Sequence, residues 1–301
     1  MKGEKAGLAA ACPKCEKSFV GIHPNPNGLE MPDMYAYKRT RITSDEEERL
    51  RLGYKLSTHY EKGTVLKSSN VTVDGNCLMS IEYEHNASII QLNRGTKRNQ
   101  DESQEGGFTL CSACNRWLFG EERIERHAPQ KNTDQDSYGR CPKNAKPDDI
   151  LRNIFLYTIG SHDAVTIRVP LPKGVDPLRA EEFYVTLKES LLQGMQIALN
   201  LGESEVDGLL LTENDNPSNT EILLYETAEG GTGAIASFNE EAKFKQVLAR
   251  AREILHDVGD DKTGCIKACY ECLLNYYNQR EHELIDRSLV LPFLRLLEVE
   301  L

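Results

Sequence analysis

Three cysteines within eight residues, close to the end of the 301-residue chain, constrain its fold more than any other feature. Cys265, Cys269 and Cys272 are followed by aromatic, amide and basic residues that continue to Arg287. Short loops allow several soft thiolates to converge on one zinc ion, at bond lengths of about 2.3 Å. The sequence therefore predicts a metal-bound cysteine knuckle that continues into a helix.

Three thiolates leave a tetrahedral zinc ion with one ligand missing. His282, ten residues after Cys272, is the predicted fourth ligand, because it would follow within a few helical turns. His162 and His256 could reach the cluster only through the fold. A metal-free thiol cluster and a catalytic zinc with an open fourth position are the alternatives.

Two Cys-x-x-Cys pairs predict a second zinc site. Each pair supplies two thiolates from one tight turn, and two such turns close a tetrahedral structural site. We expect the pairs to combine although 95 residues separate them: Cys12 and Cys15 with Cys111 and Cys114. An alternative set uses only nearby chain: Cys111, Cys114, His127 and Cys141.

The charge of the chain limits its partners. With 36 basic and 47 acidic residues the formal net charge is −11, so any nucleic-acid contact must come from a local patch. No apolar run approaches the roughly 20 residues that span a bilayer, and the N-terminus does not resemble a signal peptide. We therefore expect a soluble, cytoplasmic protein without membrane contact, whose nine cysteines are metal ligands or buried thiols rather than disulfides.

Residues 1–145 are predicted to form a zinc-ribbon-like module with an antiparallel β insertion. Ser44–Arg51 has the serine cap, acidic first turn and basic later turn of a short helix, which Gly53 should end. Alternating or β-branched residues then predict four strands, at 54–60, 64–73, 77–83 and 88–92.

Residues 146–301 are predicted to form an α+β domain. Apolar residues at helical spacing predict a long helix over 178–201, stopped at Gly202. The other predicted elements are strands at 162–171, 206–211 and 221–225, a helix that continues to about residue 256, and a last helix at 288–298. This order, with a cysteine knuckle before the last helix, indicates the α+β class.

Two features could bind nucleic acid. The glycine run at Gly230 and Gly231 could hold a phosphate on free amides, but it lacks P-loop and dinucleotide spacing, so a tight strand-to-helix crossing is expected. Four residues of the knuckle could stack on or pair with a single strand: Tyr276, Tyr277, Arg280 and Arg287.

With Tyr270, the knuckle has three tyrosines at near-helical spacing. Because such aromatic residues usually belong to a core, we expect at least half of these rings to be buried. The chain shows no serine–histidine–aspartate set and no paired-carboxylate motif at recognisable spacing, so no catalytic residue is assigned.

The segment from Leu223 to Arg287 resembles the MrfA-type zinc-binding domain, which lies at the C-terminus of DEAD/DEAH-box superfamily 2 helicases. The resemblance is carried by a tyrosine–acid turn that ends in Gly-Gly-x-Gly, and by the string Cys-Tyr-x-Cys-Leu…Asn-Gln…His…Asp-Arg, in order and at family spacing. The stretch from Arg41 to Leu56 and the flanking Cys-x-x-Cys pairs are similar to the region before that domain in very large bacterial and archaeal helicases.

This resemblance implies a DNA-directed accessory module with zinc in its knuckle, acting in DNA repair or anti-phage defence. Its partner would be a pair of helicase motor domains, on the same polypeptide or on a separate subunit. Repair helicases of this kind have four cysteines in the cluster, whereas this chain has three. It also has no P-loop, no Asp-Glu-x-His Walker B motif and too few residues for two RecA-like domains, so it should not hydrolyse ATP alone.

Two other functions are compatible with the sequence. A zinc-dependent hydrolase or nuclease could use the Cys265 cluster together with Glu226 or His162. A protein-interaction subunit of a defence complex is the other, and the acidic charge favours it.

Overall fold

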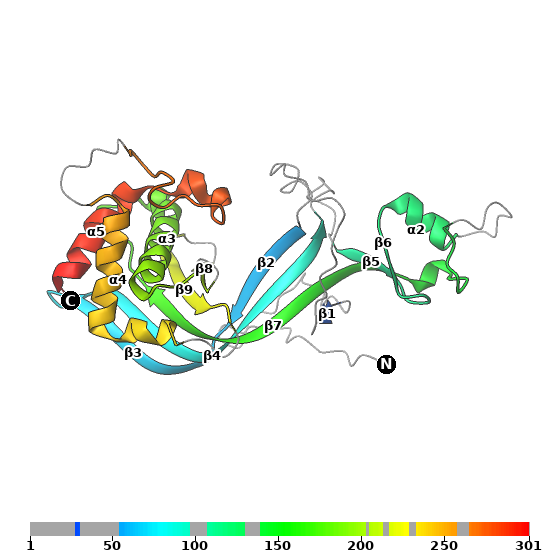
Figure 1. Ribbon diagram of the computed structural model, residues 1–301, viewed down its shortest axis with the longest axis horizontal. Helices are drawn as coiled ribbons and strands as arrows, with labels where there is room; N and C mark the ends of the chain where they lie inside the picture. The colour runs from blue at the N-terminus through cyan, green and yellow to red at the C-terminus, as the bar shows by residue number, and fades with distance from the viewer. Residues whose placement is uncertain are drawn as a thin grey trace. The chain divides into compact units, whose positions relative to one another are not determined.

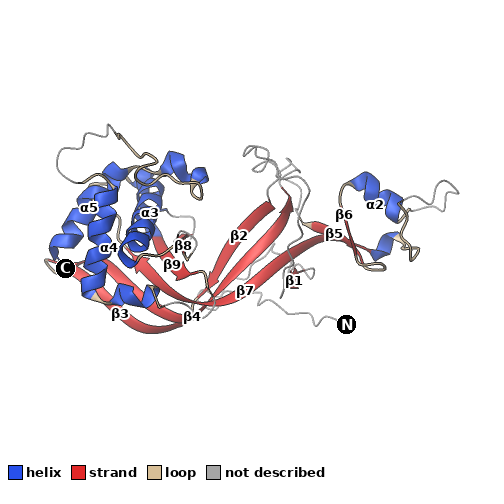
Figure 2. Cartoon of the chain, viewed as in Figure 1, coloured by secondary structure: helices blue, strands red, loops and turns tan. Residues whose placement is uncertain are grey.

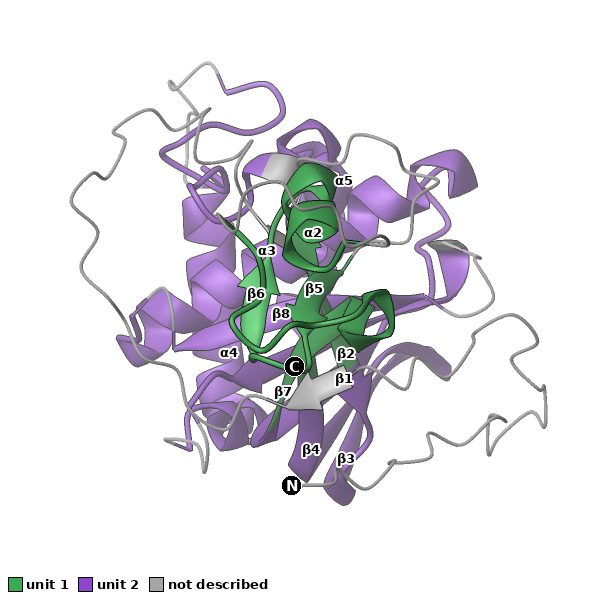
Figure 3. Cartoon of the chain, turned by 90° about the vertical axis from the view of Figure 1, so that its right-hand side faces the viewer, with its two compact units in different colours: residues 1–59, 90–159 green, residues 60–89, 160–301 purple. Residues whose placement is uncertain are grey.

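The computed structural model of the protein describes residues 28–30, 54–96, 107–129, 139–202, 205–212, 217–228, 233–257 and 265–300. The chain divides into two compact units (Figure 3): unit 1 contains residues 1–59 and 90–159, and unit 2 contains residues 60–89 and 160–301. The predicted helix at Ser44–Arg51 lies outside the described residues. The domain boundary between residues 145 and 146 remains a prediction.

Unit 1 combines short strands with the helix α2 (Figure 1). β1 (Gly28–Glu30) runs parallel to residues 155–157 of the long strand β7 (Ile150–Arg168). β5 (Phe108–Cys111) is antiparallel to the first residues of β7 and to β6 (Arg116–Leu118). α2 (Glu121–His127) follows, with glutamates in its first turn and basic residues in its last, as the helix dipole favours.

Unit 2 contains an antiparallel sheet. β3 (Thr64–Val73) pairs with residues 76–85 of β4 (Asn76–Thr96), and both follow β2 (Tyr54–Glu61) along the chain. β9 (Thr220–Glu226) lies between β8 (Val206–Thr212) and residues 164–168 of β7, antiparallel to both.

Three helices cover one face of this sheet (Figure 2): α3 (Ala180–Leu199), α4 (Glu241–Ile254) and α5 (Arg287–Glu300). Asp176 caps the turn that leads into α3, because its side chain accepts a hydrogen bond from the Leu178 amide at 2.9 Å. The short 3-10 turns are η1 (Pro147–Asp149), η2 (Pro177–Arg179), η3 (Pro217–Asn219), η4 (Ile235–Asn239) and η5 (Gln279–Leu284).

The core of unit 2 forms around α3. Of the five apolar positions that the helical spacing predicts, Phe183, Leu187, Leu191 and Met195 are completely buried, and Leu199 is partly buried. They pack with residues of β7, β9, α4 and α5 in one hydrophobic cluster. Burial of such side chains stabilises the fold by about 1.5–3 kcal/mol each. The mixed helices and antiparallel sheet confirm the predicted α+β class.

Two strands differ from the sequence prediction. A turn is expected at His85-Asn86, but β4 continues through it as one strand, with Asn86 at φ +57°. The Asn86 side chain accepts a hydrogen bond from Ser161 Oγ at 3.1 Å, which holds this irregularity within the sheet. β7 begins at Ile150 rather than near 162, because β1 and β5 provide pairing partners that single-sequence periodicity does not reveal.

None of the described helices combines the length and the apolar character needed to cross a membrane.

Candidate metal centres

Unit 1 gathers three thiols and an imidazole in one place. Cys111 ends β5, Cys114 lies in the turn before β6, and His127 ends α2. Cys141 lies in the described stretch that begins at residue 139. Their ligand atoms all lie within 4.8 Å of one another. The Cys111 and Cys141 sulfurs are 3.9 Å apart, close to the roughly 3.8 Å that a tetrahedron with zinc–sulfur bonds of about 2.3 Å requires. This is the local set considered from the sequence.

The surroundings of this cluster favour the metal-binding form of two of its side chains, His127 and Cys141. His127 Nδ1 is 3.2 Å from the Gly139 carbonyl, to which it can donate a hydrogen bond. Its Nε2 is 3.3 Å from Cys114 Sγ, and in that tautomer Nε2 carries the lone pair that can bind a metal. The Lys143 amide donates to Cys141 Sγ at 3.4 Å. Burial acts to raise the pKa of Cys141, but the contacts of its sulfur with the backbone amides of Lys143 and Ala145 outweigh burial and lower the pKa. Burial raises the pKa of Cys114.

Unit 2 contains the second group, formed by His256, Cys265, Cys269 and Cys272. Their ligand atoms also lie within 4.8 Å of one another. His256 Nε2 is 3.3 Å from Cys269 Sγ, and the sulfurs of Cys265 and Cys272 are 4.0 Å apart. The knuckle turn aims amides inward, since the Cys269 amide donates to Cys272 Sγ at 2.9 Å. Three sulfurs and one imidazole fit the donor preference of zinc.

The thiols of this group have different proton affinities. Burial, reinforced by the neighbouring Cys272, raises the pKa of Cys265 to about 12. Burial acts in the same direction on Cys269, but its contact with His256 and the backbone amides outweighs it and lowers the pKa to about 7. Burial also raises the pKa of Cys272. A bound metal ion would hold all three as thiolates.

Arg287 fastens the knuckle to the end of α4. Its guanidinium donates to the Cys265 carbonyl at 2.6 Å and to the Leu255 carbonyl at 2.7 Å, and its amide donates to the Lys267 carbonyl at 2.9 Å. One side chain thus positions the segments that carry His256 and Cys265. The structure supplies this positioning role, which sequence reasoning did not assign.

His282, the fourth ligand expected from the sequence, makes other contacts. Its Nε2 is 2.9 Å from Asn278 Oδ1 and 3.1 Å from the Asn275 carbonyl. His256 stands with the thiols instead. The sequence signal for His256 is a histidine at the end of a predicted helix. It stands thirteen residues before Cys269, and the same separation lies between Cys114 and His127. Cys12 and Cys15 lie outside the described residues.

Of the six residues predicted to bind nucleic acid, the structure describes the side chains of three, Tyr276, Tyr277 and Arg287. Gly230 and Gly231 lie outside the described residues, as does the side chain of Arg280. The adjoining Gly233 and Ile235 amides donate to the buried carboxylate of Glu226 at 3.3 and 2.8 Å, which fits the expected tight crossing. The expectation that at least half of the three tyrosine rings are buried is wrong: Tyr270, Tyr276 and Tyr277 are 72%, 53% and 70% exposed.

Two groups of thiols and imidazole on an α+β framework define a zinc-binding protein. Residues 187–273 match the family model of the MrfA Zn-binding domain, from within α3 to the residue after Cys272.

Among solved structures, the chain is similar to the crystal structure of the DUF1998 helicase MrfA bound to DNA. The TM-score is 0.44 at 10% sequence identity, and the match covers 80% of this chain and 25% of that chain. The chain therefore spans about a quarter of that helicase. A search of curated proteins finds no match.

Proposed function

We propose that this chain is a zinc-binding accessory region of a superfamily 2 DNA helicase, which braces the motor and guides DNA without hydrolysing ATP itself. The observation that carries the proposal is the match of residues 187–273 to the MrfA Zn-binding domain, with all four candidate ligands of the unit 2 group inside the same stretch. The helicase motor would be on the same polypeptide or on a separate subunit. DNA repair and anti-phage defence are the processes in which such a region would act.

We assign the zinc a structural role. Each group supplies four donors, so a tetrahedral ion would have no open position for a catalytic water. In unit 2 the donors come from the end of α4 and from the knuckle, and a bound ion would join these segments. The free energy of such binding, about 10–16 kcal/mol for structural zinc at neutral pH, would then contribute directly to folding.

Metal content and folding, measured on the same variant, test this assignment. We expect Cys269→Ser to lower the zinc content of the purified chain and to destabilise unit 2 in a thermal or urea melt. A matched control is Cys77→Ser, which removes an exposed cysteine outside both groups and should change neither quantity. Retained folding together with loss of a hydrolytic activity would contradict the structural assignment and favour the zinc hydrolase.

DNA binding as a function of salt tests the guiding role. Contacts with several phosphates release counterions, so the logarithm of the binding constant should fall steeply and linearly with the logarithm of the salt concentration. The acidic net charge of −11 makes this a demanding test, because the contacts must come from a local patch. An absence of DNA binding would instead favour the protein-interaction subunit.

A further inference from the structure

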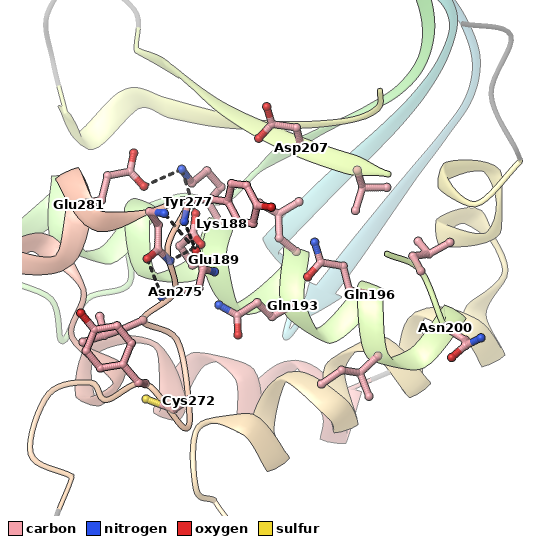
Figure 4. A pocket seen from close by; sticks show the side chains of 17 residues that line it. Lys188, Glu189, Gln193, Gln196, Asn200, Asp207, Cys272, Asn275, Tyr277 and Glu281 are labelled. Atoms are coloured by element: carbon pink, nitrogen blue, oxygen red, sulfur yellow. Dashed lines mark hydrogen bonds and ion pairs between the residues drawn. The ribbon is translucent and has the colours of Figure 1, made fainter. Parts of the chain in front are cut away.

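A polar cavity of about 670 Å³ lies beside the knuckle of unit 2 (Figure 4). Its walls are the middle and end of α3, the start of β8 and the chain from Tyr270 to Glu281. Its volume falls within the roughly 300–1,000 Å³ of typical small-ligand pockets. Nothing in the zinc-binding role requires a cavity at this place.

The floor of the cavity is a buried ionic network. Lys188 Nζ is 3.1 Å from Glu189 Oε1 and 2.8 Å from Glu281 Oε2, and Asn278 Nδ2 donates to Glu189 Oε2 at 2.7 Å. Lys188, Glu189 and Asn278 are all more than nine-tenths buried. Burial opposes the charge on Lys188, but the two carboxylates outweigh it and raise its pKa. Charged groups that are buried in this way beside a cavity are typical of a ligand-binding site.

Amides and aromatic rings line the rest of the cavity. Gln193 donates through Nε2 to the Leu273 carbonyl at 2.9 Å, which fixes its amide while Oε1 remains an acceptor. Tyr270 and Tyr277 lie at the mouth, where both rings are largely exposed. A fixed amide and an exposed ring that line the same cavity can act on one flat ligand: the amide pairs with its edge and the ring stacks on its face.

The charge of the cavity decides which part of a nucleic acid could enter. The charged residues of the lining are one lysine, Lys188, and three carboxylates, those of Glu189, Glu281 and Asp207, so a phosphate would be repelled. A neutral base would not be. The bases of a single strand can turn away from their own backbone, which would leave the phosphates outside.

We propose that this cavity takes one unstacked nucleobase of a single DNA strand, with Tyr277 stacked on its face and Gln193 paired with its edge. The proposal rests on the DNA-guiding function above. Under this proposal the chain contacts a base of the guided strand, whereas phosphate contacts alone would position the strand without contacting any base.

The test compares two strands of equal length and charge, binding to the full zinc-loaded chain. One is an oligothymidylate of about 12 nucleotides, within the usual site sizes for single strands, and the other is the same backbone with abasic sites throughout. We expect the chain to prefer the base-bearing strand about tenfold or more, as one base–aromatic stack allows. Gln193→Ala and Tyr277→Ala should reduce this ratio and leave binding of the abasic strand unchanged, while Tyr277→Phe should keep the ratio.

A control substitution in an exposed side chain away from the cavity, Val299→Ala, should leave the ratio as it is. Equal binding of both strands by the unmodified chain would overturn the base pocket while the guiding function stands. Failure to bind either strand would overturn both. If the ratio is one and N-acetyl-arginine amide binds the chain but not Tyr277→Ala, the cavity belongs to a basic side chain of a protein partner, and the nucleobase assignment is wrong.

Discussion

His256 combines a left-handed backbone with a ring nitrogen 3.3 Å from the thiol of Cys269. Its φ of +58° follows the last turn of α4, where its amide donates to the Glu253 carbonyl and the Asp257 amide donates to the Arg252 carbonyl. Glycine is the usual residue at this position of a helix end, because a Cβ there costs about 1–2 kcal/mol. A side chain kept at such a position in spite of the cost points to a function, here as a metal ligand.

Substitution of His256 separates its role as a metal ligand from the cost of its left-handed backbone conformation. We expect His256→Gly to lower the bound zinc by one equivalent and, in the presence of a chelator, to leave the metal-free chain equally stable or up to about 1 kcal/mol more stable. His282→Ala is the comparison, because its ring contacts Asn278 and the Asn275 carbonyl rather than the thiols. Metal analysis and urea unfolding measure both effects. Zinc loss in His282→Ala, with His256→Gly still fully loaded, would restore His282 as the fourth ligand.

At the scale of the elements, α3 and α4 approach closely at one glycine. A Cβ built on Gly194 would lie 2.7 Å from the Val247 carbonyl oxygen and 2.9 Å from Ala251 Cβ. Both neighbours belong to α4, and one is backbone, so neither can move aside without shifting the helix. The absence of a side chain at this position therefore sets the distance between the two helices.

Gly194→Ala tests this close approach. Alanine in a helix is intrinsically favoured over glycine by about 1 kcal/mol, but overpacking a core costs about 1–3 kcal/mol. We expect the second effect to win and the free energy of unfolding to fall by up to about 2 kcal/mol. Gly174→Ala is the control, since a Cβ there would meet nothing within 4 Å. An unchanged or raised midpoint in urea would show that α4 moves freely relative to α3.

The start of α5 depends on a buried carboxylate. Asp286 accepts from the Ser288 amide at 3.0 Å and from Arg179 Nη2 at 2.7 Å. Burial works against the ionised form, but these hydrogen bonds and the positive charge of Arg179 outweigh it and lower the pKa of Asp286. A lowered pKa means that the carboxylate stabilises the fold at pH values above the unfolded pKa of about 4, and that this contribution is lost as the pH falls through the folded pKa.

Asp286→Asn keeps the cap acceptor and removes the charge. We expect this variant to be less stable than the unmodified chain by about 1–3 kcal/mol at neutral pH, because the Arg179 pairing and a charge-assisted hydrogen bond are lost. The difference should stay constant from pH 7 to about pH 5 and shrink below about pH 4. Urea melts over that range give the comparison, and zinc released by acid affects both proteins alike. A difference that grew on acidification would contradict the lowered pKa.

At the scale of the whole molecule, the sequence predicts what depends on local patterns. The spacing of Phe183, Leu187, Leu191 and Met195 identifies α3 and its buried stripe, because helical periodicity and burial follow from the same geometry. The thiol spacing likewise predicts the ligand chemistry. Which histidine stands beside the thiols does not follow, because the position of His256 depends on how the end of α4 meets the knuckle.

The cavity also escapes sequence reasoning. Lysine and glutamate are usually exposed, so Lys188 and Glu189 resemble solvated positions on an amphipathic helix. Both side chains are buried because the chain from Tyr270 to Glu281, which is distant in sequence, packs over them. The same holds for the long strands β4 and β7, whose continuity depends on partners distant in sequence.

The number of zinc ions and their ligands can be determined for the whole chain. If the group in unit 1 is Cys111, Cys114, His127 and Cys141, the chain should hold two zinc ions, one for each group. Cys141→Ser should then lower the zinc content to one ion per chain. Hydrogen exchange should rise around β5, β6 and α2 while α3 and α4 remain protected, because none of the ligands of that ion belongs to unit 2. Cys12→Ser should leave the content unchanged. The opposite pattern, with zinc lost in Cys12→Ser and kept in Cys141→Ser, would support the two-pair site expected from the sequence, since the same thiols of Cys111 and Cys114 cannot close both tetrahedra at once.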